Sequence, residues 1–153
     1  MDSEEKFKAS VLSFLRSKGF IFISSSGGKF VKIQNRKFSL KRASKILKLP
    51  PYLIEGLSSS RADVKAIYNR TPFIIELKFI REGACPISLM DRELGQLLRY
   101  YFEVKYLNNI QARLIVNDPS QIEFYTALIK FFNLPLKVYT IENFLKNLEE
   151  EQE

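Results

Sequence analysis

The sequence has no histidine and no tryptophan, and its single cysteine is Cys85. Without histidine the chain cannot form a Ser-His or Cys-His nucleophilic site, a histidine-based phosphohydrolase site or a Cys/His zinc site. One cysteine also excludes a disulfide within the chain. A hydrolase of this composition must therefore rely on carboxylates, lysine and a metal ion.

The sequence also lacks any apolar run near the ~20 residues that span a bilayer. Residues 1–5 are mostly acidic and do not resemble a signal peptide. We therefore expect no membrane contact and a cytoplasmic protein. Because 46% of the 153 residues are hydrophobic, we expect one globular domain over 1–148. Residues 149–153 are expected to form a frayed acidic tail.

Positive charge is concentrated in the first half of the chain. Residues 1–80 hold 16 Lys and Arg against 6 Asp and Glu, a net charge of +10. Residues 81–153 hold 8 against 11, a net charge of −3, which leaves the stated +7 for the whole chain. This asymmetry predicts one basic face for a polyanion and favours nucleic acid over a merely solubilising surface.

Residues 61–80 read as a β-hairpin, because two runs of β-branched and aromatic residues flank Asn69-Arg70-Thr71-Pro72. A two-residue turn at 69–70 would place Asp63 opposite Glu76. A four-residue loop at 69–72 would place Asp63 opposite Lys78 and diagonal to Glu76. Either register puts the three charged residues on one face, whereas a one-residue slip would scatter them.

Two carboxylates on one sheet face repel each other, so this pairing is not chosen for stability. A hard divalent cation such as Mg²⁺ would relieve the repulsion, and Lys78 could orient a water or stabilise charge on a phosphate. Without metal, one carboxyl should bind a proton more readily than its model compound. Replacing Asp63 or Glu76 should then leave the metal-free protein as stable or slightly more stable. The alternative is a half-exposed hairpin with ordinary surface charges.

At these residues the chain resembles the PD-(D/E)XK nuclease superfamily, whose pattern is an acidic residue on one strand and Glu/Asp-x-Lys on the next. Here the pattern falls on Asp63 and on Glu76-Leu77-Lys78, after the hydrophobic pair Ile74-Ile75. Ala62 stands where the superfamily name has Pro, a position that varies among its members. A second element, Gln96 to Tyr100, is similar to the Gln-x-x-x-Tyr pattern of the RecB-like branch. It falls on a helix expected over 91–107.

The resemblance implies a restriction-endonuclease-like α/β fold with a mixed central sheet flanked by helices. It implies a DNA phosphodiester hydrolase that uses Mg²⁺ or Mn²⁺, with the metal held by Asp63, Glu76 and the Leu77 carbonyl. Lys78 would orient the attacking water, and Gln96 and Tyr100 would bind a catalytic carboxylate or the substrate phosphate. Glu5, on the first helix, is a further candidate ligand.

Several alternatives remain open at this point. A resolvase of branched DNA is one, although the early glutamate of archaeal Holliday-junction resolvases would fall nearer Lys8 than Glu5. A non-catalytic nucleic-acid-binding protein with the same fold is another. The substrate could also be RNA, and the protein could be a homodimer.

The basic residues gather in 24–58, which we interpret as an insertion between the first strand and the metal-binding hairpin. Ser24–Gly28 reads as a loop and 30–33 as a strand. Ser39 is expected to cap a helix that Pro50-Pro51 stops. A helix-turn-helix over 43–57 is set aside because of these prolines. The expected phosphate contacts are Lys29, Lys32, Arg36, Lys37, Lys41, Arg42, Lys45, Lys48 and Arg61.

The remaining segments alternate between helix and strand. A helix is expected over 4–18, with Ser3 as its N-cap and Phe7, Val11, Phe14 and Leu15 as its buried stripe. A short strand follows at 21–23 and a loop at 81–89. Toward the end we expect strands at 111–116 and 136–139 and helices at 122–132 and 141–148. This alternation predicts parallel pairing at the far edge of the sheet.

Overall fold

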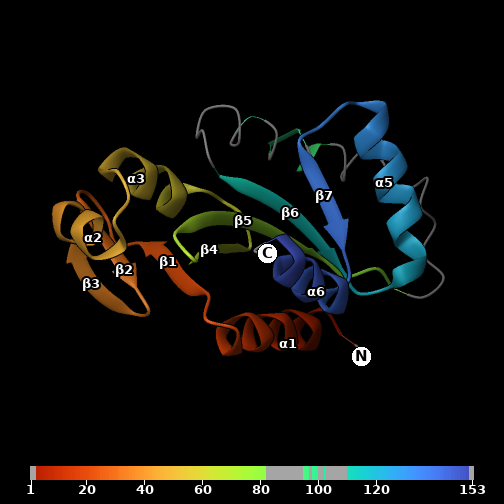
Figure 1. Cartoon of the computed structure of the whole chain (residues 1–153), viewed down its shortest axis with the longest axis horizontal. Coiled ribbons are helices and arrows are strands. Elements are labelled where there is room, and N and C mark those ends of the chain that lie inside the picture. The colour runs from red at the N-terminus through yellow and green to blue at the C-terminus, as the bar shows by residue number, and fades with distance from the viewer. Residues whose placement is uncertain (1–2, 82–94, 97, 100–101, 103–109, 152–153) are drawn as a thin grey trace.

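The computed structural model describes residues 3–81, 95–96, 98–99, 102 and 110–151. A seven-stranded mixed sheet in the order β3-β2-β1-β4-β5-β6-β7 lies at its centre, with helices on both faces (Figure 1). This confirms the expected α/β class with a mixed sheet flanked by helices. The elements are α1 (Glu4–Ser17), β1 (Ile21–Ser25), β2 (Phe30–Ile33), β3 (Arg36–Ser39), α2 (Leu40–Leu47), α3 (Pro51–Ser59), β4 (Val64–Tyr68), β5 (Thr71–Lys78), β6 (Gln111–Val116), the 3-10 turn η1 (Pro119–Gln121), α5 (Ile122–Phe131), β7 (Leu136–Tyr139) and α6 (Ile141–Glu151).

The sheet changes character along its width. From β3 to β5 every neighbouring pair is antiparallel, whereas β5, β6 and β7 pair in parallel. Parallel neighbours need a crossover connection, and α5 provides it between β6 and β7. The prediction of parallel pairing at the far edge is therefore confirmed.

Each face of the sheet has its own apolar core. On one face α1 and α6 pack Val11, Leu15 and Phe144 against Ile75 and Ile115. On the other face α2, α3 and α5 cover the sheet. The largest fully buried side chains of this core are those of Ile54, Leu57, Ile74 and Tyr125. Strand β5 is buried on both faces because it lies near the centre of this three-layer arrangement (Figure 1).

The β4–β5 hairpin closes with a two-residue turn. Tyr68 pairs with Thr71 and Val64 with Ile75. Asn69 and Arg70 have φ values of 49° and 65°, the left-handed pair typical of a type I′ hairpin turn. The two-residue alternative is thus confirmed. The four-residue loop is wrong because Thr71 already pairs as the first residue of β5.

The segment 24–58 contains more regular structure than the sequence predicted. Ser24 and Ser25 belong to β1 and not to a loop, and β3 was not predicted. The prolines do mark the boundary between two helices, since α2 ends at Leu47 and Lys48 is its left-handed C-cap. They also begin α3, because proline is favoured at the first helical position, where an N–H has no helical partner. Two consecutive helices, which the sequence analysis had set aside, therefore occur here.

Most of the other expected elements are present, with changes at their ends. Ser3 Oγ accepts the Lys6 N–H at 3.2 Å and caps α1 as predicted. Phe14, expected in the buried stripe, is 47% exposed. Helix α6 continues to Glu151, so residues 149–151 of the predicted tail are helical. Residues 95–96, 98–99 and 102 are helical, whereas the predicted loop and most of the helix over 91–107 lie outside the described residues.

Among the described residues, no helix has the length and apolar character needed to cross a membrane.

Candidate active site

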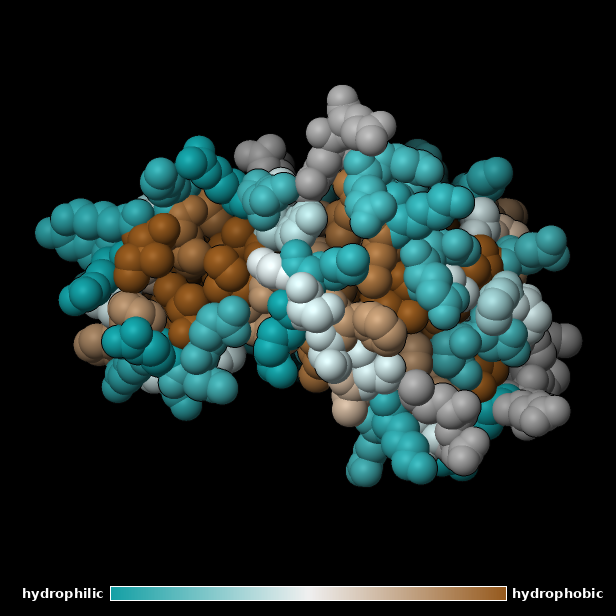
Figure 2. All heavy atoms as spheres, turned by 60° about the horizontal axis from the view of Figure 1, so that its bottom comes forward, coloured by the Kyte–Doolittle hydropathy of each residue, from teal (hydrophilic) through white to brown (hydrophobic). Residues whose placement is uncertain are grey.

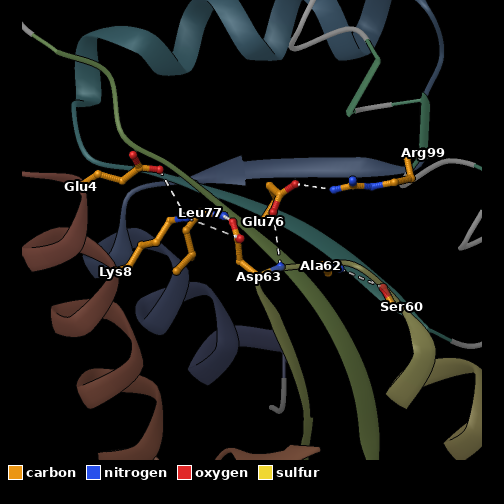
Figure 3. Close-up of polar contacts among 8 residues, drawn as sticks. All are labelled: Glu4, Lys8, Ser60, Ala62, Asp63, Glu76, Leu77 and Arg99. Atoms are coloured by element: carbon orange, nitrogen blue, oxygen red, sulfur yellow. Dashed lines mark hydrogen bonds and ion pairs between the residues drawn. The ribbon is translucent and has the colours of Figure 1, made fainter. Parts of the chain in front are cut away.

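The hairpin brings Asp63 and Glu76 together at its open end. Asp63 directly precedes β4, whose first residue Val64 pairs with Ile75, and Glu76 follows Ile75 on β5. The Asp63 N–H donates to Glu76 Oε1 at 3.3 Å, and the Leu77 N–H donates to Asp63 Oδ2 at 2.9 Å. Ser60 Oγ accepts the Ala62 N–H at 3.2 Å and shapes the entry of the chain into the strand (Figure 3).

Glu76 is the buried member of the pair. Its side chain is only 6% exposed, and Glu76 Oε2 lies 2.8 Å from the Arg99 guanidinium. Because Glu76 alternates with Leu77 along β5, it points to the same side of the sheet as Ile74, toward the layer that contains α3 and α5. Burial of a carboxylate requires a paired charge, and Arg99 supplies it here.

Asp63 meets a different cation on a different element. Asp63 Oδ1 lies 3.6 Å from Lys8 Nζ, and Lys8 Nζ lies 3.3 Å from Glu4 Oε1 one helical turn earlier. Lys8 belongs to α1, on the opposite face of the sheet from Ile74. In Figure 3 Lys8 and Arg99 approach the two carboxylates from opposite sides. Cations from two different helical segments therefore contact the two carboxylates.

The pKa of Asp63 lies below its usual value. Burial raises this pKa, but the hydrogen bond with the Glu76 side chain, the Leu77 N–H and the Lys8 ammonium together lower it by more. The pKa of Lys8 is raised, since Asp63 and Glu4 outweigh the opposing effect of burial. Asp63 is thus not the carboxyl that binds a proton more readily. Its ionisation stabilises the fold above an unfolded pKa of ~3.9, and that contribution is lost as pH falls through the lower folded value.

The other predicted site residues are only partly brought together. Lys78 is half-buried at the end of β5, on the same side as Glu76, and its carbonyl accepts the Asn117 N–H at 3.3 Å. Gln96 is half-buried on the helix that carries Arg99. Glu5 is exposed on α1, and Lys8 occupies the contact with Asp63 instead. Tyr100 lies outside the described residues.

The predicted phosphate contacts are all exposed. Eight of the nine belong to the segment from Lys29 to Lys48, and the exception is Arg61, two residues before Asp63. The loop after α2 lines a surface hollow together with Arg70 and Thr71 at the turn of the hairpin. Five residues of β4, at ~3.3 Å each, separate that turn from Asp63. The loop after α2 thus lies at the turn end of the hairpin and the carboxylates at its open end.

Lys8 and Arg99 are functional candidates that the sequence analysis missed. The i, i+4 spacing of Glu4 and Lys8 signalled an ion pair on α1 but gave no indication of Asp63. Arg99 lies within the Gln96 to Tyr100 motif, where attention fell on the two end residues. Neither contact can be predicted from a local sequence pattern, because each joins segments that are far apart in the sequence.

No protein-family model and no curated protein matches this sequence. The fold is similar to the crystal structure of an FdxN element excision controlling factor protein from Anabaena variabilis. The TM-score is 0.50 at 16% sequence identity, and the similarity covers 92% of this chain and 94% of that chain. At this identity the comparison shows a shared α/β fold alone.

Proposed function

We propose that this chain is a metal-dependent nuclease with a restriction-endonuclease-like core that hydrolyses DNA phosphodiester bonds. The observation that carries the proposal is the meeting of Asp63 and Glu76 at the open end of a hairpin, where the Asp63 N–H donates to Glu76 Oε1 and the Leu77 N–H donates to Asp63 Oδ2. Carboxylates brought this close normally cost stability, and a divalent cation is the usual reason to keep them. The protein of similar fold is named for controlling excision of an element, which supplies no activity for this chain.

The donor atoms fit a hard cation such as Mg²⁺ or Mn²⁺. Such ions use one or two carboxylates together with waters, and Asp63, Glu76 and the Leu77 carbonyl would supply the protein oxygens. Among the described residues no group of three His, Cys, Asp or Glu side chains comes together, so most other ligands would be water. Asp63 offers the more accessible oxygens, since its side chain is 29% exposed.

The roles of the residues follow from their positions. A bound Mg²⁺ or Mn²⁺ would lower the pKa of its water and neutralise charge on the scissile phosphate. Asp63 and Glu76 would hold the ion at the end of the hairpin, beside the Lys78 side chain. Lys78 would orient the attacking water in line with the leaving 3′-oxygen. Gln96, on the helix that supplies Arg99, and Tyr100 would position the phosphate or a carboxylate.

The basic residues would hold the DNA backbone beyond the cleavage site. They include the exposed face of α2, where Ala43 and Leu47 are buried and Lys41, Lys45 and Lys48 are exposed. Lysines on one helix face can follow a phosphate backbone without reading bases. Arg61 lies close enough in sequence to Asp63 to hold the phosphate next to the scissile bond.

Reversing Lys41, Lys45 and Lys48 to Glu should weaken DNA binding and leave the fold intact. All three side chains are exposed, so their replacement removes phosphate contacts without disturbing the core. Fluorescence anisotropy over a series of salt concentrations should give lower affinity and a shallower salt dependence for the variant. Unchanged affinity, with an unchanged circular dichroism spectrum, would show that α2 does not contact the DNA.

A second candidate is a nucleic-acid-binding protein without catalysis. It is favoured by the ion pairs of Lys8 with Asp63 and of Arg99 with Glu76, because both carboxylates already have a cation within 4 Å. In this case the two cations would take the place of a metal ion and hold the hairpin against the layers on either side. The basic surface would then be the functional part of the molecule.

Incubation with labelled DNA separates the two candidates. Linear, circular and branched DNA, and an RNA of the same sequence, would each be incubated with and without Mg²⁺ or Mn²⁺. A nuclease produces metal-dependent products, and the circular and branched substrates distinguish endonuclease, exonuclease and resolvase activities. Binding of all substrates without any product, at metal concentrations up to several millimolar, would support the non-catalytic candidate.

A further inference from the structure

The sheet face formed by β2 and β3 carries an aromatic ring among lysines. Phe30 pairs with Ser39 and Lys32 with Lys37, so these four residues share one face of the two strands. On the next strand Ser24 lies beside Lys32 and continues that face. The alternate residues Val31 and Ile33 point the other way, into the core beneath α2.

Phe30 is exposed although it lies on a strand. It is 44% exposed, and Lys37 Nζ lies 4.7 Å from the centre of its ring. Lys32 and Lys37 are both exposed and directly opposite each other, which destabilises a strand pair. Lysines protect edge strands such as β3 from aggregation, but such protection does not account for an exposed aromatic ring beside them.

Within the described part of the chain, the helices on this side of the sheet do not extend over β2 and β3. Helix α1 lies to the right of β1 in Figure 1, and the hairpin of β2 and β3 extends beyond it to the left. At this end of the molecule apolar atoms reach the surface between hydrophilic side chains (Figure 2). The pattern of cation and ring continues toward α1, where the Arg16 guanidinium lies 5.2 Å from the ring centre of Phe22.

From this face we infer that β2 and β3 form a binding platform for single-stranded DNA, on which a base stacks against Phe30. Lys32 and Lys37 would bind the flanking phosphates, and Lys29 would extend the contact along the strand. An aromatic ring surrounded by cations on a sheet binds unpaired bases, since each base presents a stacking face only when it is unpaired. The inference rests on the proposed DNA substrate but not on cleavage.

The test is the affinity of the full chain for a fluorescent 20-nucleotide thymidine oligomer, measured by anisotropy in EDTA. Phe30→Ala should weaken this binding about 5- to 150-fold, the range that corresponds to the ~1–3 kcal/mol of one stacked base. Binding of a duplex of equal length should change less than twofold. Phe30→Trp, which keeps a stacking surface, should bind the single strand at least as tightly as the original protein.

Phe131→Ala is the matched control, because Phe131 is 83% exposed at the end of α5, outside the β2–β3 face. It should bind both DNAs as the original protein does. The inference would be overturned if Phe30→Ala lost the same affinity for the duplex as for the single strand, or if Phe131→Ala lost as much affinity as Phe30→Ala. Tighter binding of a uridine oligomer than of the thymidine oligomer would also overturn it. Because this binding assay is run in EDTA, a failure of the protein to cleave DNA leaves the platform standing. If the protein cleaves duplex DNA but does not bind the single strand, the platform is contradicted and the proposed nuclease activity is not.

Discussion

Replacement of Asp63 by Asn should abolish metal-dependent cleavage and the stabilisation of the folded protein by metal. For the original protein, Mn²⁺ at ~100 times its dissociation constant would add ~2.7 kcal/mol to the free energy of unfolding. In a chain of 153 residues this corresponds to a rise in melting temperature of about 5–10 °C. Asn keeps the shape of the side chain but removes a charged ligand, so this rise should disappear. Cleavage should fall by at least ~10²-fold.

The matched control is Lys8→Met, which removes the cation beside Asp63 and keeps both carboxylates. Because Lys8 Nζ lies 3.6 Å from Asp63 Oδ1, it competes with a metal ion for that oxygen. This variant should therefore keep or increase the metal-induced rise in melting temperature. The pair does not bind metal if Mn²⁺ raises the melting temperature equally in the original protein, in Asp63→Asn and in Lys8→Met.

Replacement of Glu76 by Ala should destabilise the metal-free protein by about 2–4 kcal/mol, measured by urea unfolding in EDTA. Glu76 is 6% exposed at its side chain and pairs with Arg99, so its loss leaves a guanidinium without its carboxylate. Asp63→Asn should cost less than about 1 kcal/mol, since that pair is more exposed and longer. This prediction differs from the expectation from sequence that either replacement would be neutral or slightly stabilising.

Glu76→Gln provides the control for this second experiment. The amide keeps a hydrogen-bond acceptor for Arg99 and fills the same volume, so it should retain more stability than Ala. If Glu76→Ala and Asp63→Asn unfold at the same urea concentration as the original protein, the Arg99 contact contributes nothing to stability. Because Glu76→Gln should stay folded, a loss of cleavage in this variant can be distinguished from a loss of folded protein.

The sequence was informative wherever local pattern determines structure. The turn at Asn69-Arg70, the caps at Ser3 and Ser39 and the alternation along β5 all depend on neighbours within a few residues. These features were sufficient to predict the hairpin, its two possible registers and the meeting of Asp63 with Glu76. The parallel edge followed from the order of strand and helix segments.

What the sequence did not reveal depends on distant contacts or on residues with two roles. Lys8 and Arg99 reach the carboxylates from segments 55 and 23 residues away, a separation that no periodicity reports. Pro51 signals both the end of one helix and the start of another, and only the packed structure shows that both occur. The short strand β3 lacks a continuous apolar pattern, since Arg36 and Lys37 begin it.

The parallel register of β5 and β6 has a consequence for the order of folding. Residues of the β4–β5 hairpin find partners a few positions away, whereas Phe73 must meet Gln111, 38 positions later. Closing the longer loop costs more chain entropy, and non-local strand pairing is correspondingly slow. We therefore expect Asp63 and Glu76 to meet before β6 docks. Pulse-labelled hydrogen exchange during refolding should show β4 amides protected ahead of β6 amides, and the reverse order would contradict this sequence of events.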